Sequence, residues 1–281
     1  MTPSTARWRT LHQRLTPYEG WSTVALVSLL LLAMAWAMEA SHWVPQMPSL
    51  TRAVLLALAT AFVFSKLPLP GLLLHPLSLV VGAAVVIWQA SHLTTQLSLL
   101  GRAQEVVERL DLWLGATRFG TISVDILPFV AMLVAILWLT SYLAAWLAFR
   151  GRHAWLPVVP GGIVLLVTLN YTPGRLNVYF FVYLLVALVL GARLNYLKQR
   201  RAWQKSGAYQ GDGVGLSFAT EGFLLAFVAL LVVWQLPVQR PETPVRQAWA
   251  RLSGPFDSFQ SEFNRVFAST SSLKPMPMHT F

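Results

Sequence analysis

The chain has 281 residues, of which 56% are hydrophobic and 11% are charged, and it contains no cysteine. Soluble domains average about 25% charged residues, so no soluble core of this length absorbs so much apolar surface, whereas a lipid bilayer does. The lack of cysteine excludes disulfides, thiolate metal sites, CxxCH haem attachment and a cysteine nucleophile. The net charge of +10 lies in loops beside apolar runs, where bases face phospholipid headgroups rather than nucleic acid.

Seven apolar runs follow a charged segment at residues 1–20. A bilayer core takes about 20 apolar residues in helical form. The first run starts at Trp21 and ends in the small-x-small sequence 35–37, which is typical of a signal-peptide cleavage site. It exceeds the apolar region of about 7–15 residues in signal peptides, so we expect an uncleaved membrane helix. The predicted spans lie near residues 21–38, 53–65, 72–90, 126–149, 155–170, 178–192 and 218–236.

The clearest pair of spans is 126–149 and 155–170, joined by the basic turn Arg150-Gly151-Arg152-His153. Pro160-Gly161-Gly162 predicts a kink in the second span, or the close approach of a neighbouring helix. Span 53–65 is short and is expected to form a tight hairpin with 72–90. Aromatic residues gather near the basic turn, where a ring lies in lipid and its polar atom among the headgroups: Trp138, Tyr142, Trp146 and Trp155.

Two amphipathic segments lie outside the spans. In the first, residues 97–114, charged side chains such as Glu108 lie opposite apolar ones such as Leu100, and we expect it on the outer membrane surface. The second is the tail, residues 238–281. Its apolar stripe must rest on the membrane surface, on outer loops of this chain or on a partner, because exposed phenylalanines are costly in water. The stripe recurs at helical spacings of three and four: Trp249, Leu252, Phe256, Phe259, Phe263 and Val266.

Basic residues in short loops set the orientation of a membrane protein. Here they are Arg150, Arg152 and a cluster after the sixth span, for which anionic-lipid binding is a second role. We therefore predict an all-α, polytopic protein of the bacterial cytoplasmic (inner) membrane with about seven transmembrane helices. Its transmembrane domain covers residues 21–237, its N-terminus is cytoplasmic and its C-terminus is extracytoplasmic. The cluster consists of Arg193, Lys198, Arg200, Arg201 and Lys205.

Three aromatic motifs resemble those of a known family. They are Trp8…Glu19-Gly20-Trp21, then Trp138-Leu-Thr-Ser-Tyr142 with Trp146…Arg150, and Trp155…Pro157…Pro160-Gly161. In this order and spacing they resemble the N-terminal multi-helix membrane region of bacterial transglutaminase-like membrane proteins of the TgpA type. The likeness covers most of the chain, to about residue 250. In that family an extracytoplasmic papain-like domain with a cysteine, histidine and aspartate triad follows. We expect this chain to have the membrane region without the catalytic domain, because it lacks cysteine.

Candidate binding residues within the spans are few. His75 and His92 lie near opposite ends of span 72–90. A neutral imidazole in a membrane can ligate a haem iron or a chlorophyll magnesium. Alternatively, both histidines sit at headgroup level and bond to water or backbone. The acidic residues Glu39, Asp125 and Glu221 fall at span ends, which favours interfacial caps over a proton or ion pathway.

These features favour a non-catalytic accessory or structural subunit of a larger membrane complex, not an enzyme. Its expected partners are the lipid bilayer and other integral membrane subunits, contacted through Trp- and Phe-rich surfaces and the tail, with no nucleic acid. A bacterial photosynthetic reaction centre–light-harvesting assembly is one setting. There, lipid, quinone, (bacterio)chlorophyll or carotenoid would bind at the periphery, although no cofactor is required and no metal site is expected. The alternatives are a membrane anchor partnering a separately encoded transglutaminase-like domain, and a small-molecule or lipid transporter.

Overall fold

A computed structural model describes residues 20–44, 47–118, 125–151, 153, 155–172, 177–205 and 227. Every regular element in this part of the chain is helical, as the apolar runs predict. The order of the elements is α2 (Trp21–Ala40), α3 (Leu50–Lys66), α4 (Gly71–Ala90), η1 (Ser91–Leu93), α5 (Leu99–Arg118), α6 (Ile126–Trp146), η2 (Leu147–Gly151), α7 (Val158–Tyr171) and α8 (Asn177–Lys205).

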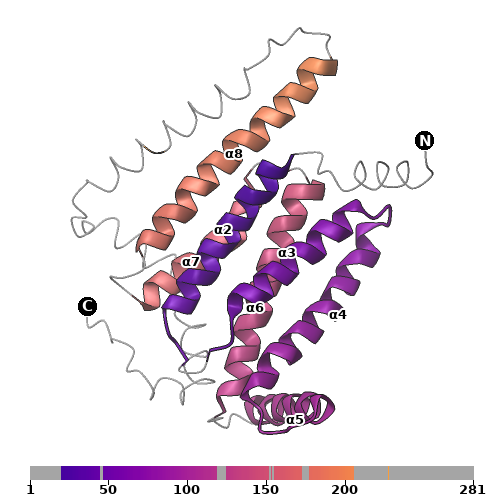
Figure 1. Cartoon of the computed structure of the whole chain (residues 1–281), viewed down its shortest axis with the longest axis vertical. Coiled ribbons are helices and arrows are strands. Elements are labelled where there is room, and N and C mark those ends of the chain that lie inside the picture. The colour runs from indigo at the N-terminus through magenta and orange to yellow at the C-terminus, as the bar shows by residue number, and fades with distance from the viewer. Residues whose placement is uncertain are drawn as a thin grey trace, which may run out of the picture.

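The helices form a bundle around α2 and α6 (Figure 1). α3 packs most extensively against α6, and α8 packs most extensively against α2. α4 and α8 lie on opposite sides of the bundle. In the most apolar stretch of α6, 67% of the residues are buried, against 22% in that of α4. α6 is therefore the central helix, whereas α4 is an edge helix with a broad apolar face turned outward.

α5 differs from the other helices in its direction and in its surface. It lies across the end of the bundle, where α4 ends and α6 begins (Figure 1). Its Val106 is fully buried in a small cluster with Ala90, Leu127 and Ala131. Charged and apolar side chains both remain exposed elsewhere on α5. This helix is the amphipathic segment predicted at residues 97–114.

Four helical stretches are long and apolar enough to cross a membrane: Trp21–Ala40, Gly71–Leu93, Ile126–Gly151 and Val178–Arg200. They correspond to the predicted spans 21–38, 72–90, 126–149 and 178–192. The helix in predicted span 155–170 is shorter, with an apolar stretch at Val158–Leu169. The helix in predicted span 53–65 has 17 residues. Predicted span 218–236 lies outside the described residues, apart from Phe227. The described part of the chain is thus all-helical, and four of its helical stretches are suited to a membrane.

The helix in predicted span 178–192 extends beyond the predicted end of that span. α8 continues without a break to Lys205, so the basic cluster lies on the helix and not in a loop. The sequence pattern was misleading because a run of bases is typical of a loop at the membrane surface. Here the first of these bases, Arg193, finds a partner on a neighbouring helix. Its Nε donates to Oγ1 of Thr23 in α2, at 2.9 Å.

Glycines allow two close approaches of aromatic rings to helix backbones. A Cβ added at Gly161 would lie 2.7 Å from the hydroxyl oxygen of Tyr183. That hydroxyl donates to the Val158 carbonyl at 2.5 Å and so fastens the first turn of α7 to α8. The Pro-Gly-Gly sequence in α7 therefore serves the close approach that was one of its two predicted roles. The other approach, at Gly82, is part of the α4–α6 contact described below.

Candidate functional site

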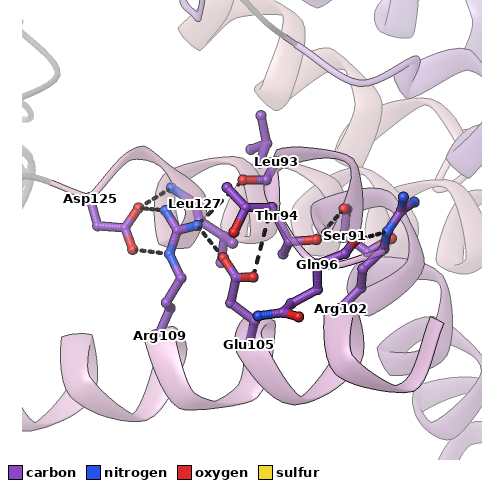
Figure 2. A network of polar contacts seen from close by, with 10 residues as sticks. Ser91, Leu93, Thr94, Gln96, Arg102, Glu105, Arg109, Asp125 and Leu127 are labelled. Atoms are coloured by element: carbon purple, nitrogen blue, oxygen red, sulfur yellow. Dashed lines mark hydrogen bonds and ion pairs between the residues drawn. The ribbon is translucent and has the colours of Figure 1, made fainter. Parts of the chain in front are cut away.

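Polar side chains gather at both ends of the bundle. At the α5 end, Arg109 extends from α5 toward the start of α6 (Figure 2). Its Nε donates to Asp125 Oδ2 at 2.7 Å, and its Nη2 donates to Asp125 Oδ1. Its Nη1 reaches Glu105 Oε1 at 3.3 Å and the Leu93 carbonyl at 3.4 Å. A two-pronged guanidinium–carboxylate pair of this kind fixes orientation as well as distance. Arg109 thereby joins α5, η1 and α6.

Asp125 also caps α6, since its Oδ1 accepts the Leu127 N–H at 2.9 Å. Partial burial raises the pKa of Asp125, but the Arg109 guanidinium and the Leu127 N–H outweigh it, and the net pKa lies below its ordinary value. The hydrogen bond to Asp125 conversely raises the pKa of Arg109. Both groups therefore stay charged at neutral pH, and Asp125 is the interfacial cap that the sequence predicts.

Glu39 caps a second helix, α3, at this end of the bundle. It lies in the last turn of α2, and its Oε1 accepts the backbone N–H of Thr51, in the first turn of α3, at 2.8 Å. Its Oε2 accepts the Thr51 hydroxyl at 3.2 Å. A carboxylate at a helix N-terminus satisfies free N–H groups and complements the helix dipole. Fully buried Gln89 of α4 braces the same corner, because its Nε2 donates to the Ser49 carbonyl at 2.8 Å.

At the opposite end, an aromatic cluster surrounds His75 on α4. Its Nδ1 lies 3.3 Å from the hydroxyl of Tyr142, and its ring centroid lies 4.8 Å from that of Trp146. Tyr142 and Trp146 are buried on α6, whereas His75 is exposed on the outer face of α4. His75 is thus held on one side by α6 and open on the other, as a ligand to a planar cofactor would have to be.

Arg150 extends this cluster to the C-terminus of α3. Its guanidinium carbon lies 4.9 Å from the centroid of the Trp146 ring. Its Nη1 donates to the carbonyls of Phe64 at 3.4 Å and Leu67 at 3.1 Å, and its Nη2 donates to that of Leu69 at 2.6 Å. The last carbonyls of a helix lack partners within it. Arg150 supplies such partners from the single π-helical turn Leu147–Gly151.

A narrow polar seam runs between α4 and α6. The side chains of Ser78 and Trp138 are almost fully buried along it. The Trp138 indole nitrogen has no hydrogen-bond partner in the described part of the chain. The Ser78 hydroxyl lies close to the Tyr142 phenol without a hydrogen bond of ordinary geometry. Gly82 makes room for the indole, because a Cβ there would lie 2.5 Å from Trp138 Nε1. Small residues at membrane-helix contacts allow this closeness.

The remaining predicted site residues are dispersed. His92 is exposed in η1, with its ring 5.9 Å from that of Trp88, so it lies at the opposite end of α4 from His75, as predicted. Lys198 and Arg200 are exposed on the last turns of α8, and Arg201 lies on the same helix. Arg193, predicted to contact lipid or a partner, is directed into the bundle through Thr23. The apolar stripe Trp249, Leu252, Phe256, Phe259, Phe263 and Val266 lies outside the described residues.

Within the described ranges, no three histidine, aspartate or glutamate side chains gather closely enough to hold a metal ion. Sequence reasoning missed three contributors to the polar clusters: Arg109, Gln89 and Ser78. Gln89 and Ser78 could have been noticed as polar residues inside an apolar run. The partner of Arg109 could not, because the sequence pattern does not show how α5 is placed relative to Asp125 at the start of α6.

Comparison with protein-family models, with characterised proteins and with solved structures finds no match to this chain. The class of the protein therefore follows from the architecture of the described residues, whose regular elements are all helices, several of them apolar and of membrane-spanning length. The resemblance to the transglutaminase-like membrane region rests on the aromatic motifs alone. In the structure, four residues of those motifs, Trp138, Tyr142, Trp146 and Arg150, lie along the α4–α6 contact.

Proposed function

We propose that this chain is a non-catalytic structural subunit of a larger complex in the bacterial cytoplasmic membrane. One observation carries the proposal. Four ionisable side chains, Glu39, Asp125, Arg150 and Arg193, each cap a helix end or connect two helices. Charged groups in membrane proteins usually mark transport or catalysis, whereas these have architectural roles. A bundle stabilised in this way acts through its surfaces.

The outward face of α4 is the surface best suited to such a role. Large apolar side chains cover it along most of its length, among them Leu72 at 84% exposure and Val80 at 66%. Ala83 and Ala84, in the middle of the helix, are exposed as well. Small residues between large ones let a neighbouring membrane helix approach closely. We propose that α4 packs against another integral membrane subunit, with lipid covering the remainder.

A bacterial photosynthetic reaction centre–light-harvesting assembly remains the setting that we propose for this subunit. Exposed His75 supports it, because its Nδ1 lies 3.3 Å from the Tyr142 hydroxyl while the residue remains exposed on the outer face of α4. A hydrogen bond at one ring nitrogen fixes the tautomer and the orientation of a ligating histidine. His75 would then be the residue of this chain that touches a peripheral (bacterio)chlorophyll, while His92 would touch headgroups.

The test is isolation of the chain from native membranes in a mild detergent under non-denaturing conditions. Mass spectrometry then identifies the proteins that migrate with it, and an absorption spectrum detects pigment. We expect other membrane subunits at a fixed ratio to this chain. The variant Ala84→Phe, on the outward face of α4, should fold normally but no longer migrate with the other subunits. The matched control is Ala103→Phe on α5, which should still migrate with them. A chain that migrates alone from native membranes contradicts the proposal.

A second candidate is a membrane anchor that partners a separately encoded transglutaminase-like domain. The observation that favours it is the position of the motif residues in one continuous cluster, from Trp138 to Arg150 along α6. A shared helix framework would place them together. The same isolation distinguishes the two candidates, since an anchor would migrate with a soluble protein that carries a cysteine, histidine and aspartate triad and with no pigment.

A further inference from the structure

The exposed surface of α5 carries two neighbouring lines of residues that differ chemically. Leu100, Val107 and Leu114 recur every seven residues, which places them along one line of the helix. Their side chains are 72%, 52% and 46% exposed. Gln104, Glu108 and Asp111 follow at spacings of four and three, along the adjacent line, and are exposed as well. α5 thus presents an apolar line and a polar line side by side.

The third side of α5 fixes it to the bundle. Val106 is fully buried against Leu127 and Ala131 of α6. Arg109, on the same side, holds Asp125 at the start of α6 and the Leu93 carbonyl at the end of η1 (Figure 2). α5 is therefore held against the start of α6 and the end of η1, at one end of the bundle, and its apolar line does not turn inward to join the core. Something other than the bundle core must therefore cover this apolar line.

We propose that α5 is a surface helix whose apolar line, Leu100, Val107 and Leu114, is inserted between the phospholipids of the adjacent leaflet. The inference is independent of the proposed complex. An amphipathic helix of this kind lies in the plane of the membrane, with its apolar side at the boundary between headgroups and acyl chains. Its polar line, Gln104, Glu108 and Asp111, then faces water. This arrangement needs no pocket and no specific lipid.

Two observations favour phospholipid as the occupant. α4 and α6 are candidate membrane spans, and α5 lies across their ends (Figure 1), which is the level of the headgroups. An aromatic side chain also marks this level, because Trp88 is 41% exposed in the last turns of α4, and η1 and α5 follow it along the chain. Tryptophan is enriched at this level of a bilayer.

The absence of cysteine makes a direct test possible, because one introduced cysteine takes up all of a thiol-reactive probe. The full chain is reconstituted into vesicles of phosphatidylcholine and phosphatidylglycerol, with an environment-sensitive fluorophore at Val107→Cys or, as the matched control, at Glu108→Cys. Quenching is measured with lipids brominated on the acyl chain and with aqueous iodide. A second pair, Leu100→Cys and Gln104→Cys, repeats the comparison nearer the N-terminus of α5. Leu100 lies two turns before Val107, and Gln104 lies one turn before Glu108.

We expect brominated lipid to quench the probe at Val107→Cys, with a blue-shifted emission, and iodide to quench the probe at Glu108→Cys. Iodide quenching of equal extent at both positions would overturn the proposal, since α5 would then lie in water. A Val107→Cys probe that neither agent quenches would overturn it too, because protein would then cover the apolar line. A probe at Leu79→Cys, exposed on α4, confirms insertion of the bundle, and circular dichroism confirms its helical fold.

Discussion

The indole of Trp138 in α6 fills the space that a Cβ at position 82 of α4 would need, with 2.5 Å between that Cβ and Nε1. Trp138 is almost fully buried, so its ring has no free space into which to move. The position of α4 against the bundle therefore depends on a residue without a side chain. Since α4 is the edge helix, this contact decides how firmly it is held.

Gly82→Leu should separate α4 from α6. Overpacking of a filled contact costs about 1–3 kcal/mol, and the loss should appear as a lower apparent unfolding midpoint in detergent, followed by tryptophan fluorescence. Ala83→Leu is the control, because residue 83 is exposed on the outward face of the same turn. Equal midpoints for the two variants would contradict the close approach.

Arg150→Ala should destabilise the C-terminus of α3. The carbonyls of Leu67 and Leu69 would lose the Arg150 guanidinium as a donor, and that of Phe64 would keep only the Leu67 N–H. Hydrogen bonds to charged groups contribute about 1.5–3 kcal/mol each when well shielded. Because Arg150 is partly exposed, we expect a total loss of about 2 kcal/mol. Faster hydrogen exchange at residues 61–67 is the measurement. Arg52→Ala, exposed at the other end of α3, should leave that exchange unchanged.

Acid should release α5 through Asp125. The folded-state pKa of this carboxyl lies below its unfolded value, so its contribution to stability is complete above about pH 4. As the pH falls through the lowered folded-state pKa, Asp125 takes up a proton, and both the Arg109 pair and the α6 cap weaken. The protection of α5 against hydrogen exchange, relative to the intrinsic exchange rate at each pH, should therefore decrease below about pH 4 in the native chain. Asp125→Asn should show fast exchange already at neutral pH, with little further change in acid; an unchanged acid response in that variant would contradict this account.

The orientation of the bundle is open to direct labelling. If the basic end is cytoplasmic, Thr95→Cys, near α5, should react with a membrane-impermeant maleimide added to spheroplasts. Leu69→Cys, beside Arg150, should react only after lysis. Both residues are exposed, so access to thiols depends on the side of the membrane. The reverse pattern would place the N-terminus outside.

The sequence predicted the positions of the helices better than the contacts between them. Glu39 and Asp125 were expected as caps at span ends, and both cap a helix. Residues 53–65 were expected to form a weak span, whereas α3 packs against α6 more extensively than any other helix does. Hydropathy measures transfer to lipid and carries no information about a neighbouring helix. The small residues of α3, such as Ala53 and Ala57, are fully buried because they allow close packing.

The polar clusters depend on contacts distant in sequence and could not be predicted. His75 and Tyr142 are separated by 67 positions, and Thr23 and Arg193 by 170. Each pair contains a residue that looks interfacial when read alone. Whether a base such as Arg193 lies in a surface loop or within a continuing helix depends on its partner, here Thr23 of α2.

The unbroken course of α8 determines where its positive charges are displayed. A helix of 29 residues is about 44 Å long, whereas the hydrocarbon core of a bilayer is about 30 Å thick. The twelve residues after Arg193 extend about 18 Å further along the axis. In a loop, Lys198 and Arg200 would settle onto the nearest headgroups. On a helix that Thr23 holds against α2, their distance from the bilayer centre is set by the helix instead, because a core of about 20 residues that starts at Asn177 ends beside Lys198.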